Sequence, residues 1–232
     1  MPPPSTERPS LGRPLFLLNL KSYPGHLGSG AIRVAKLLES LGSETGVATA
    51  IAPPLPDLAR VAELVRVPVL AQHVDPGEAG PRTGYVPVEA IEAAGARGSL
   101  VNHSEHPMAF PDIEDAVRRL AAHRLVAVVC AADVERSRRL AETRPPYLAV
   151  EPPELIGGDR AVSTARPEVV SGTVAAVHSV SPDTLVLCGA GVHDRNDVAR
   201  ALELGAEGVL VASAVTRAPD AEKAIRELLA GF

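Results

Sequence analysis

A short apolar run, Tyr147–Val150, ends directly on a carboxylate, Glu151. The run predicts a buried strand, and Pro152 and Pro153 prevent a helix or a strand from continuing past it. The pair Gly157-Gly158 then indicates a flexible segment. A carboxylate fixed at a strand end, followed by a stiff hinge and a flexible tip, suits a catalytic base beneath a closing lid. Taken alone, Glu151 would more often be a solvated loop charge.

Lys21 and His103 also come directly after apolar runs, at 15–20 and 98–102. Each has a plainer interpretation: Lys21 as a charge at the rim of the fold, and His103 as a neighbour of a helix cap. If the three groups meet, however, a Glu base and a His donor are what proton abstraction next to a carbonyl requires. The carboxylate removes the proton, and the imidazole polarises the carbonyl and shuttles protons between two oxygens.

This chemistry needs neither a metal nor a redox cofactor, so we expect none. The segment His103-Ser104-Glu105-His106 carries groups that could bind zinc, but it lacks the HExxH spacing and no third ligand is suggested. We therefore predict no metal site.

Two turns of small residues, Gly189-Ala190-Gly191 and Ala212-Ser213-Ala214, follow later apolar runs. Such turns expose backbone N–H groups, and the start of a following helix adds its positive dipole, which together favour an anion. The glycines are also compatible with a plain tight turn between strand and helix. Lys21 would add a full positive charge, so the pattern favours a small substrate that carries a phosphate.

The elements that must position these residues alternate regularly along the chain. Apolar runs predict strands, and segments with helical periodicity predict helices, in about eight strand–helix units. Asp133 and Asp194 precede two of these helices and are interpreted as N-caps. The expected strands are 15–20, 47–52, 67–72, 98–102, 125–130, 147–150, 184–188 and 209–212. The expected helices are 30–41, 56–65, 88–94, 112–123, 133–143, 169–180, 194–204 and 220–230.

The strands are continuous apolar runs, which is typical of parallel strands buried on both faces. Eight alternating units in this length predict an α/β fold, a closed parallel eight-stranded (β/α)8 barrel whose active site lies at the carboxyl ends of the strands. The structural alternative is an open doubly wound sheet. Its first strand usually leads into a Gly-rich dinucleotide motif, whereas here it leads into Asn19-Leu20-Lys21-Ser22.

Composition narrows the class of protein further. The chain has 232 residues, 46% of them hydrophobic, and a net charge of −5. The negative charge disfavours a nucleic-acid partner, and no apolar stretch approaches the roughly 20 residues needed to span a membrane. The two cysteines, Cys130 and Cys188, have no CxxC spacing, so we expect reduced, buried thiols in a cytoplasmic protein. We expect a disordered arm over residues 1–14 and a single barrel domain over 15–232.

Five motifs, taken in order, resemble triosephosphate isomerases of the short, archaeal type over nearly the whole chain from Leu15. They are Asn19-Leu20-Lys21, Ala71-Gln72-His73-Val74-Asp75-Pro76 with Thr83-Gly84, Asn102-His103-Ser104-Glu105-His106, Ala149-Val150-Glu151-Pro152-Pro153-Glu154-Leu155-Ile156-Gly157 and Leu187-Cys188-Gly189-Ala190-Gly191-Val192. The resemblance implies a TIM barrel that interconverts dihydroxyacetone phosphate and D-glyceraldehyde 3-phosphate in glycolysis and gluconeogenesis.

The resemblance also implies roles for single residues. Glu151 is the base, His103 acts as a neutral imidazole electrophile, and Lys21 stabilises the enediolate with Asn19 beside it. This mechanism is that of the family. Substrate and phosphate are held at Ile156, Gly191, Ala212 and Ser213. The site is supported by Gln72 and Glu105, and the segment from Pro152 to about Arg160 is the lid. Enclosure by the lid protects the phosphate, which an exposed enediolate would eliminate.

Two positions depart from the family pattern. The lid reads Gly157-Gly158-Asp159 where Gly-Thr-Gly is usual, and the last turn ends on Ala214 where glycine is usual. Asp159 puts a carboxylate near an anionic substrate, and a Cβ at Ala214 restricts the backbone that presents N–H groups. We therefore expect weaker phosphate binding or altered lid kinetics with the chemistry intact.

The resemblance further implies self-association, with the loop 75–85 reaching a neighbouring subunit, as a homotetramer or else a homodimer. Two other functions remain open. The first is that of a related enzyme on this fold that isomerises another small aldose or ketose phosphate, since fold and motifs do not fix the substrate. The second is that of a non-catalytic barrel, which is disfavoured because Lys21, His103 and Glu151 are all present.

Overall fold

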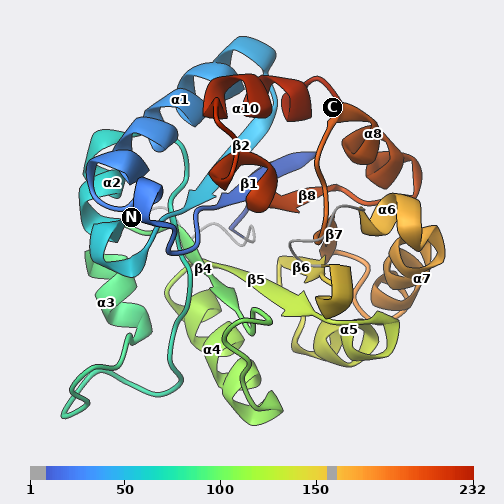
Figure 1. The fold of residues 1–232 in the computed structure, drawn as a ribbon. Helices are drawn as coiled ribbons and strands as arrows, with labels where there is room; N and C mark the ends of the chain where they lie inside the picture. The colour runs from blue at the N-terminus through green and yellow to red at the C-terminus, as the bar shows by residue number, and fades with distance from the viewer. Residues whose placement is uncertain (1–8, 156–160) are drawn as a thin grey trace, which may run out of the picture.

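The computed structural model describes residues 9–155 and 161–232. Eight parallel strands form one sheet in the order β2-β1-β8-β7-β6-β5-β4-β3 (Figure 1). A parallel bridge between Ile51 and Val69 joins the two ends of this order, so the sheet closes on itself. The predicted (β/α)8 barrel is confirmed. The strands are β1 (Leu15–Asn19), β2 (Ala48–Ala52), β3 (Leu70–Ala71), β4 (Gly98–Val101), β5 (Val126–Ala131), β6 (Tyr147–Val150), β7 (Leu185–Cys188) and β8 (Gly208–Val211).

The strands are buried on both faces, as their continuous apolar character predicts. In β1, Phe16 and Leu18 pack outward among the helices, whereas Leu15 and Leu17 pack inside the barrel. The two core clusters are therefore an outer layer between sheet and helices and an inner layer that fills the barrel. This solid interior leaves the carboxyl ends of the strands as the place where polar groups converge.

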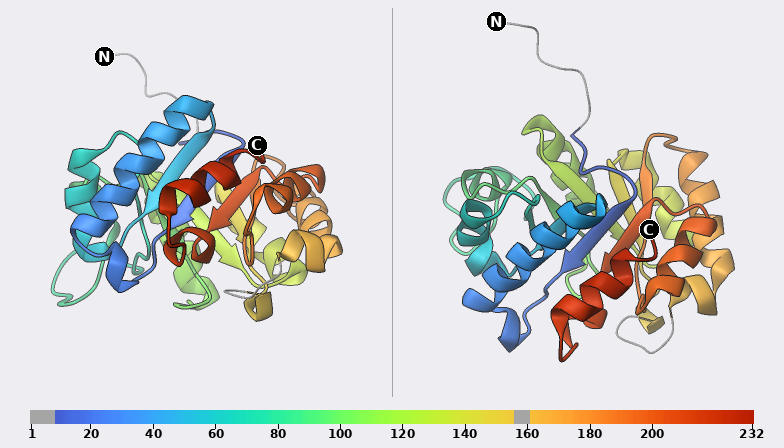
Figure 2. Two further views of the ribbon diagram at one scale, coloured as in Figure 1. Left: turned by 45° about the horizontal axis from the view of Figure 1, so that its top comes forward. Right: turned by 90° about the horizontal axis from the view of Figure 1, so that it is seen from above.

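Helices surround the barrel on all sides (Figure 2). The α-helices are α1 (Ser29–Thr45), α2 (Leu58–Leu64), α3 (Val88–Ala93), α4 (Phe110–Ala122), α5 (Val134–Leu140), α6 (Val162–Ala165), α7 (Pro167–His178), α8 (Arg195–Glu203), α9 (Ser213–Thr216) and α10 (Ala221–Leu229). Short 3-10 helices are η1 (Pro24–His26), η2 (Leu55–Asp57), η3 (Ala141–Thr143) and η4 (Pro153–Leu155). None of the described helices is long and apolar enough to cross a membrane.

Several boundaries differ from the sequence prediction for local reasons. The strand expected at 67–72 is reduced to the two residues of β3, because Pro68 has no N–H to donate to a ladder. The carbonyl of Pro68 still accepts from Ile51 N at 3.0 Å, which helps to close the barrel. The single-turn helices α6 and α9 were not predicted, because four residues carry no readable periodicity. The N-cap predictions are confirmed: Asp133 accepts from Arg136 N, and Asp194 accepts from Asn196 N and Asp197 N.

Residues 1–8 of the expected arm lie outside the described residues, whereas residues 9–14 pack against the barrel. They pass across the end of the barrel where the strands begin, and the first residue of β6, Tyr147, holds them. The Tyr147 hydroxyl accepts from Leu11 N at 2.9 Å, donates to Gly12 O at 2.9 Å and shares a hydrogen bond with Ser10 Oγ at 3.2 Å. Leu11 is buried against the inner core. A sequence pattern shows no such partner, because the hydroxyl lies more than 130 residues away.

Replacing Tyr147 by phenylalanine should destabilise the protein by about 1–3 kcal/mol, because the buried N–H of Leu11 loses its acceptor. Urea unfolding followed by circular dichroism measures the change in the free energy of unfolding. Tyr85→Phe is the matched control, since Tyr85 is 53% exposed. An unchanged free energy in Tyr147→Phe would show that the contact with residues 10–12 contributes nothing to stability.

Candidate active site

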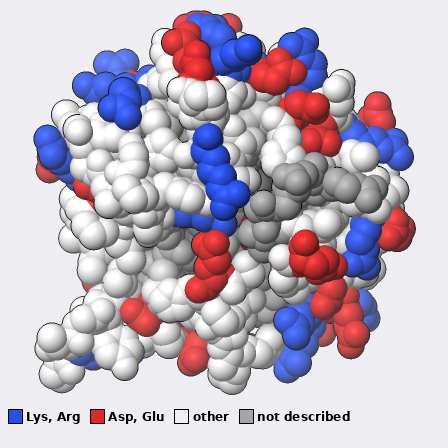
Figure 3. Space-filling view, in the orientation of Figure 1, with Lys and Arg blue, Asp and Glu red and all other residues white. Residues whose placement is uncertain are grey.

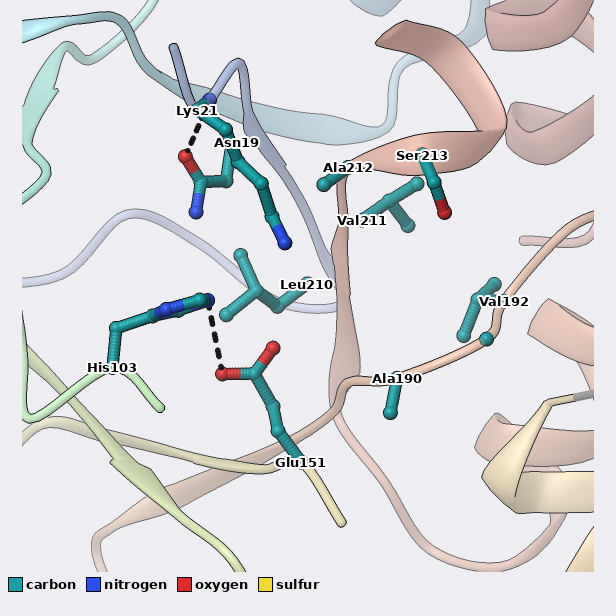
Figure 4. A pocket seen from close by; sticks show the side chains of 11 residues that line it. Asn19, Lys21, His103, Glu151, Ala190, Val192, Leu210, Val211, Ala212 and Ser213 are labelled. Carbon is teal, nitrogen blue, oxygen red and sulfur yellow. Dashed lines mark hydrogen bonds and ion pairs between the residues drawn. The ribbon is translucent and has the colours of Figure 1, made fainter. Parts of the chain in front are cut away.

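The polar groups predicted at the strand ends meet in one pocket at the carboxyl end of the barrel (Figure 4). Of the catalytic and substrate-binding residues predicted from sequence, the pocket holds all except Ile156, which lies outside the described residues together with Asp159. Ala190 and Val192, which belong to the predicted turn and its motif, complete the wall together with Leu210 and Val211. Leu210 and Val211 were predicted only as apolar strand residues. The lining residues are Asn19, Lys21, His103, Glu151, Ala190, Gly191, Val192, Leu210, Val211, Ala212 and Ser213.

Glu151 follows β6 immediately and is 6% exposed. Its backbone N–H donates to Ala131 O at 2.8 Å, which fixes the residue at the strand end. The side chain points across the pocket, and its Oε2 lies 3.7 Å from His103 Nε2 (Figure 4). That oxygen has no hydrogen-bond partner among the described residues. A buried carboxylate oxygen without a partner is rare in folded proteins and favours a functional role.

Gly189 and Cys130 pack directly against the Glu151 side chain. A Cβ built at Gly189 would come within 2.3 Å of Glu151 Cγ and 3.1 Å of Oε1. Burial, and then the negative charge of Glu151 and a hydrogen bond with it, raise the pKa of the Cys130 thiol well above its ordinary value. Cys130 therefore stays a neutral thiol, and these two residues fix the space in which the carboxylate lies.

Gly189→Ala should lower kcat on the order of 10²-fold, because the added methyl group displaces the Glu151 carboxylate. Steady-state kinetics measures the effect. Gly172→Ala on α7 is the matched control, because a Cβ there meets only Val134 at an ordinary 3.5 Å. Equal kcat values for the two variants would contradict the view that Gly189 leaves room for the carboxylate.

His103 follows β4 on a loop that Asn102 holds in place. Asn102 has a φ of 60°, and its side chain donates to Cys130 O and accepts from Met108 N, both at 2.9 Å. The backbone N–H of Glu105 donates to His103 Nδ1 at 3.2 Å. Nδ1 is therefore an acceptor, and a neutral ring carries its hydrogen on Nε2. This hydrogen faces the pocket and Glu151.

Lys21 lies in a strained turn after β1, with a φ of 52°. Its N–H donates to Asn19 Oδ1 at 2.9 Å, and its carbonyl accepts from Gln72 Nε2 at 3.0 Å. Its Nζ lies 2.7 Å from Glu105 Oε1, and the side chains of Lys21 and Glu105 are 14% and 56% exposed. Asn19, Gln72 and Glu105 thus aim one largely buried ammonium group into the pocket.

The two small-residue turns form the opposite wall. Ala190 and Gly191 have φ values of 64° and 69°, a left-handed conformation that glycine adopts freely and alanine adopts at a cost. Ser213 begins α9 directly after Ala212. Within the described residues, the N–H groups of Gly191 and Ser213 have no hydrogen-bond partner. They are thus available to an anion in the pocket.

The expected effect of Ala214 on the backbone is not supported. Ala214 is the second residue of α9 and has ordinary helical backbone, without a positive φ. Its Cβ therefore restricts nothing that the turn requires. The expectation failed because four residues are too few for a helical pattern to be recognised, so the helical turn after β8 was not predicted.

The surroundings of the pocket carry both signs of charge. On the face shown in Figure 3, Lys and Arg side chains alternate with Asp and Glu rather than forming one large basic area. Among the described residues, no group of three or more His, Cys, Asp or Glu side chains is arranged to hold a metal ion. The pocket itself combines a carboxylate, an imidazole, an ammonium group and backbone N–H donors, which can transfer protons and bind a small anion.

The triosephosphate isomerase family model matches residues 14–228. The triosephosphate isomerase of Methanothermus fervidus is 48% identical over 219 residues, covering 94% of this chain and 99% of that protein. That of Methanocaldococcus jannaschii is 44% identical over 215 residues, covering 93% and 98%.

A solved structure shares the fold. The crystal structure of triosephosphate isomerase from Bartonella henselae superposes with a TM-score of 0.70 at 18% identity, covering 86% of this chain and 92% of that one. At that identity the likeness supports the barrel alone, whereas the family match and the two relatives cover more than nine tenths of the chain. The chain belongs to the triosephosphate isomerase family.

Proposed function

We propose that this protein is a triosephosphate isomerase that interconverts dihydroxyacetone phosphate and D-glyceraldehyde 3-phosphate, as in glycolysis and gluconeogenesis. Family membership supports the activity. The observation that carries the assignment of residues is the Glu151 carboxylate facing His103 Nε2 across a pocket that also holds Lys21.

In the proposed reaction, Glu151 removes the proton from C2 of D-glyceraldehyde 3-phosphate. The electron pair moves toward the C1 carbonyl oxygen, to which the Nε2–H group of His103 donates a hydrogen bond. The imidazole then passes a proton between the O1 and O2 atoms of the enediolate. Glu151 returns a proton to C1, which yields dihydroxyacetone phosphate with no net gain or loss of atoms. A neutral His103 suits this role, because it donates at Nε2 without starting as a cation.

Lys21 is proposed to stabilise the negative charge of the enediolate and of the phosphate, with Asn19 holding its backbone. The N–H groups of Gly191, Ala212 and Ser213 are proposed to bind the phosphate oxygens, because a strained turn and the start of α9 present them to the pocket. Ile156 is proposed as a further substrate contact. It lies outside the described residues, and its role is supported by the resemblance of its motif alone.

A coupled assay tests the activity. Purified protein should convert D-glyceraldehyde 3-phosphate with a kcat/KM far above its values for D-erythrose 4-phosphate and D-ribose 5-phosphate. If one of the longer sugar phosphates were the better substrate, the protein would be a related aldose–ketose isomerase. Folded protein without activity on any of the three would favour a non-catalytic barrel.

We also propose self-association, as a homotetramer rather than a homodimer. Two hydrogen bonds anchor the loop 75–85 at its ends: Val86 N donates to Asp75 Oδ2 and Gly77 N donates to Asp115 Oδ2, both at 2.7 Å. It stands out from the barrel below α3 in Figure 1 and carries the exposed Tyr85. Beside Lys21, Gln72 and His106 line a recess of about 410 Å³ that is suited to a loop from a second copy. Light scattering tests this proposal, and a monomeric mass would contradict it.

We place the protein in the cytoplasm. Cys130 and Cys188 are both buried free thiols, and burial raises the pKa of Cys188 to about 12. Unpaired thiols are typical of a reducing compartment.

A further inference from the structure

His26 is a buried titratable residue that the proposed reaction does not use. It ends η1, on the loop that leads from Lys21 to α1, and is 9% exposed. Its Nε2 lies 3.0 Å from the backbone carbonyl oxygen of Thr216, the last residue of α9. A carbonyl only accepts, so Nε2 carries the hydrogen. Nδ1 is buried and has no partner among the described residues. The bond to Thr216 is therefore the one hydrogen bond that the imidazole makes within the described part of the chain.

Thr216 connects this bond to the phosphate turn. Both its backbone N–H, at 2.9 Å, and its Oγ1, at 3.1 Å, donate to the carbonyl oxygen of Ala212. Because α9 is a single turn, fixing Thr216 also fixes Ala212 and Ser213 at the other end. A continuous chain of hydrogen bonds thus runs from the His26 ring to the turn after β8, where Ala212 and Ser213 line the pocket.

A second contact joins the same two segments. The Arg217 guanidinium lies over the Tyr23 ring, 5.7 Å from its centroid. Tyr23 precedes η1 and Arg217 follows α9, so the contact runs alongside the bond from His26 to Thr216. The loop that places Lys21 is therefore also the support of the turn after β8.

We propose that His26 is a positioning residue for substrate phosphate: its hydrogen bond to Thr216 keeps the N–H groups of Ala212 and Ser213 directed into the pocket. This inference rests on the proposed function, because it assumes that the turn after β8 binds the phosphate. His26 touches no reacting atom. Its removal should therefore weaken phosphate binding and leave proton transfer from carbon intact.

The test compares His26→Leu with the wild type on two substrates. For D-glyceraldehyde 3-phosphate the KM should rise about three- to tenfold, and the inhibition constant of inorganic phosphate should rise equally, as expected for one lost hydrogen bond. For D-glyceraldehyde, which has no phosphate, kcat/KM should stay within about twofold of the wild type. His26→Gln should restore both constants, because its amide nitrogen can donate to the same carbonyl.

His178→Leu is the matched control. His178 Nε2 makes the same kind of bond, 3.2 Å to Thr184 O, at the end of α7 away from the pocket. Its substitution should leave both constants unchanged. If His26→Leu does not fold, His26→Gln against His26→Asn gives the same comparison, because asparagine is too short to reach Thr216.

Three results would overturn the inference. A His26→Leu variant with a lower melting temperature but unchanged KM and phosphate inhibition would show that the residue serves stability alone. An equal fall in kcat/KM for both substrates would show that it acts on the chemistry and not on the phosphate. A wild type that does not convert D-glyceraldehyde 3-phosphate would refute the proposed function itself, and the role of His26 with it.

Discussion

Replacing Glu151 by glutamine should lower kcat roughly 10²–10⁴-fold, the usual contribution of a positioned general base. The amide has the same shape as the carboxylate but does not accept a proton at neutral pH. KM should change little, because the other groups that line the pocket are untouched. Steady-state assays in both directions of the isomerisation measure the loss.

The same variant should be at least as stable as the wild type. Glu151 is 6% exposed, and its Oε2 has no hydrogen-bond partner among the described residues. The substitution therefore removes a buried charge and breaks no described hydrogen bond to that oxygen. Glu203→Gln on the exposed face of α8 is the control for both measurements. A Glu151→Gln variant that loses activity and unfolds more readily would show only that the site had collapsed.

Lys21→Met should lower kcat/KM about 10²–10³-fold, in the range found when one electrostatic donor is removed from an active site. The reason is that a largely buried ammonium group leaves the pocket that must hold a dianionic substrate and a developing enediolate. Inorganic phosphate should also inhibit more weakly. Both effects are measured by steady-state kinetics with and without added phosphate.

Lys36→Met is the matched control, since Lys36 is exposed on α1. The partner of Lys21 gives a second comparison. Glu105 is 56% exposed and pairs with the Lys21 ammonium group. Its replacement by glutamine weakens this ion pair but leaves the ammonium group in the pocket. Glu105→Gln should therefore lower kcat/KM less than Lys21→Met. The reverse order would assign the main role to the carboxylate of Glu105 instead.

The barrel and the position of its three polar groups were predictable because both depend on local patterns. The strands read mostly as apolar runs, and two of these runs end where polar residues begin, so Glu151 and His103 mark the carboxyl ends of β6 and β4. Parallel strands bring all such ends to one rim of the barrel. The meeting of Lys21, His103 and Glu151 in one pocket follows from this topology.

The contacts that support the fold and the site from a distance were not predictable, because they join residues far apart in the chain. Nothing around Tyr147 shows that its hydroxyl holds residues 10–12. Nothing around His26 shows that its ring reaches Thr216, 190 residues later. Gly189 was interpreted as part of a turn, whereas the structure shows that its missing side chain makes room for Glu151. Each depends on packing between neighbouring strand–helix units, which a one-dimensional pattern does not contain.

The most direct test of the central claim, proton transfer through Glu151, follows the fate of the transferred proton. Wild-type protein converting D-glyceraldehyde 3-phosphate in D₂O should give dihydroxyacetone phosphate with deuterium at C1, detected by proton NMR. The label is expected because a proton held on a carboxyl group exchanges with solvent before it is returned to carbon. Glu151→Gln should lose turnover and labelling together. Product formed without deuterium, or labelling at an undiminished rate in Glu151→Gln, would contradict the account.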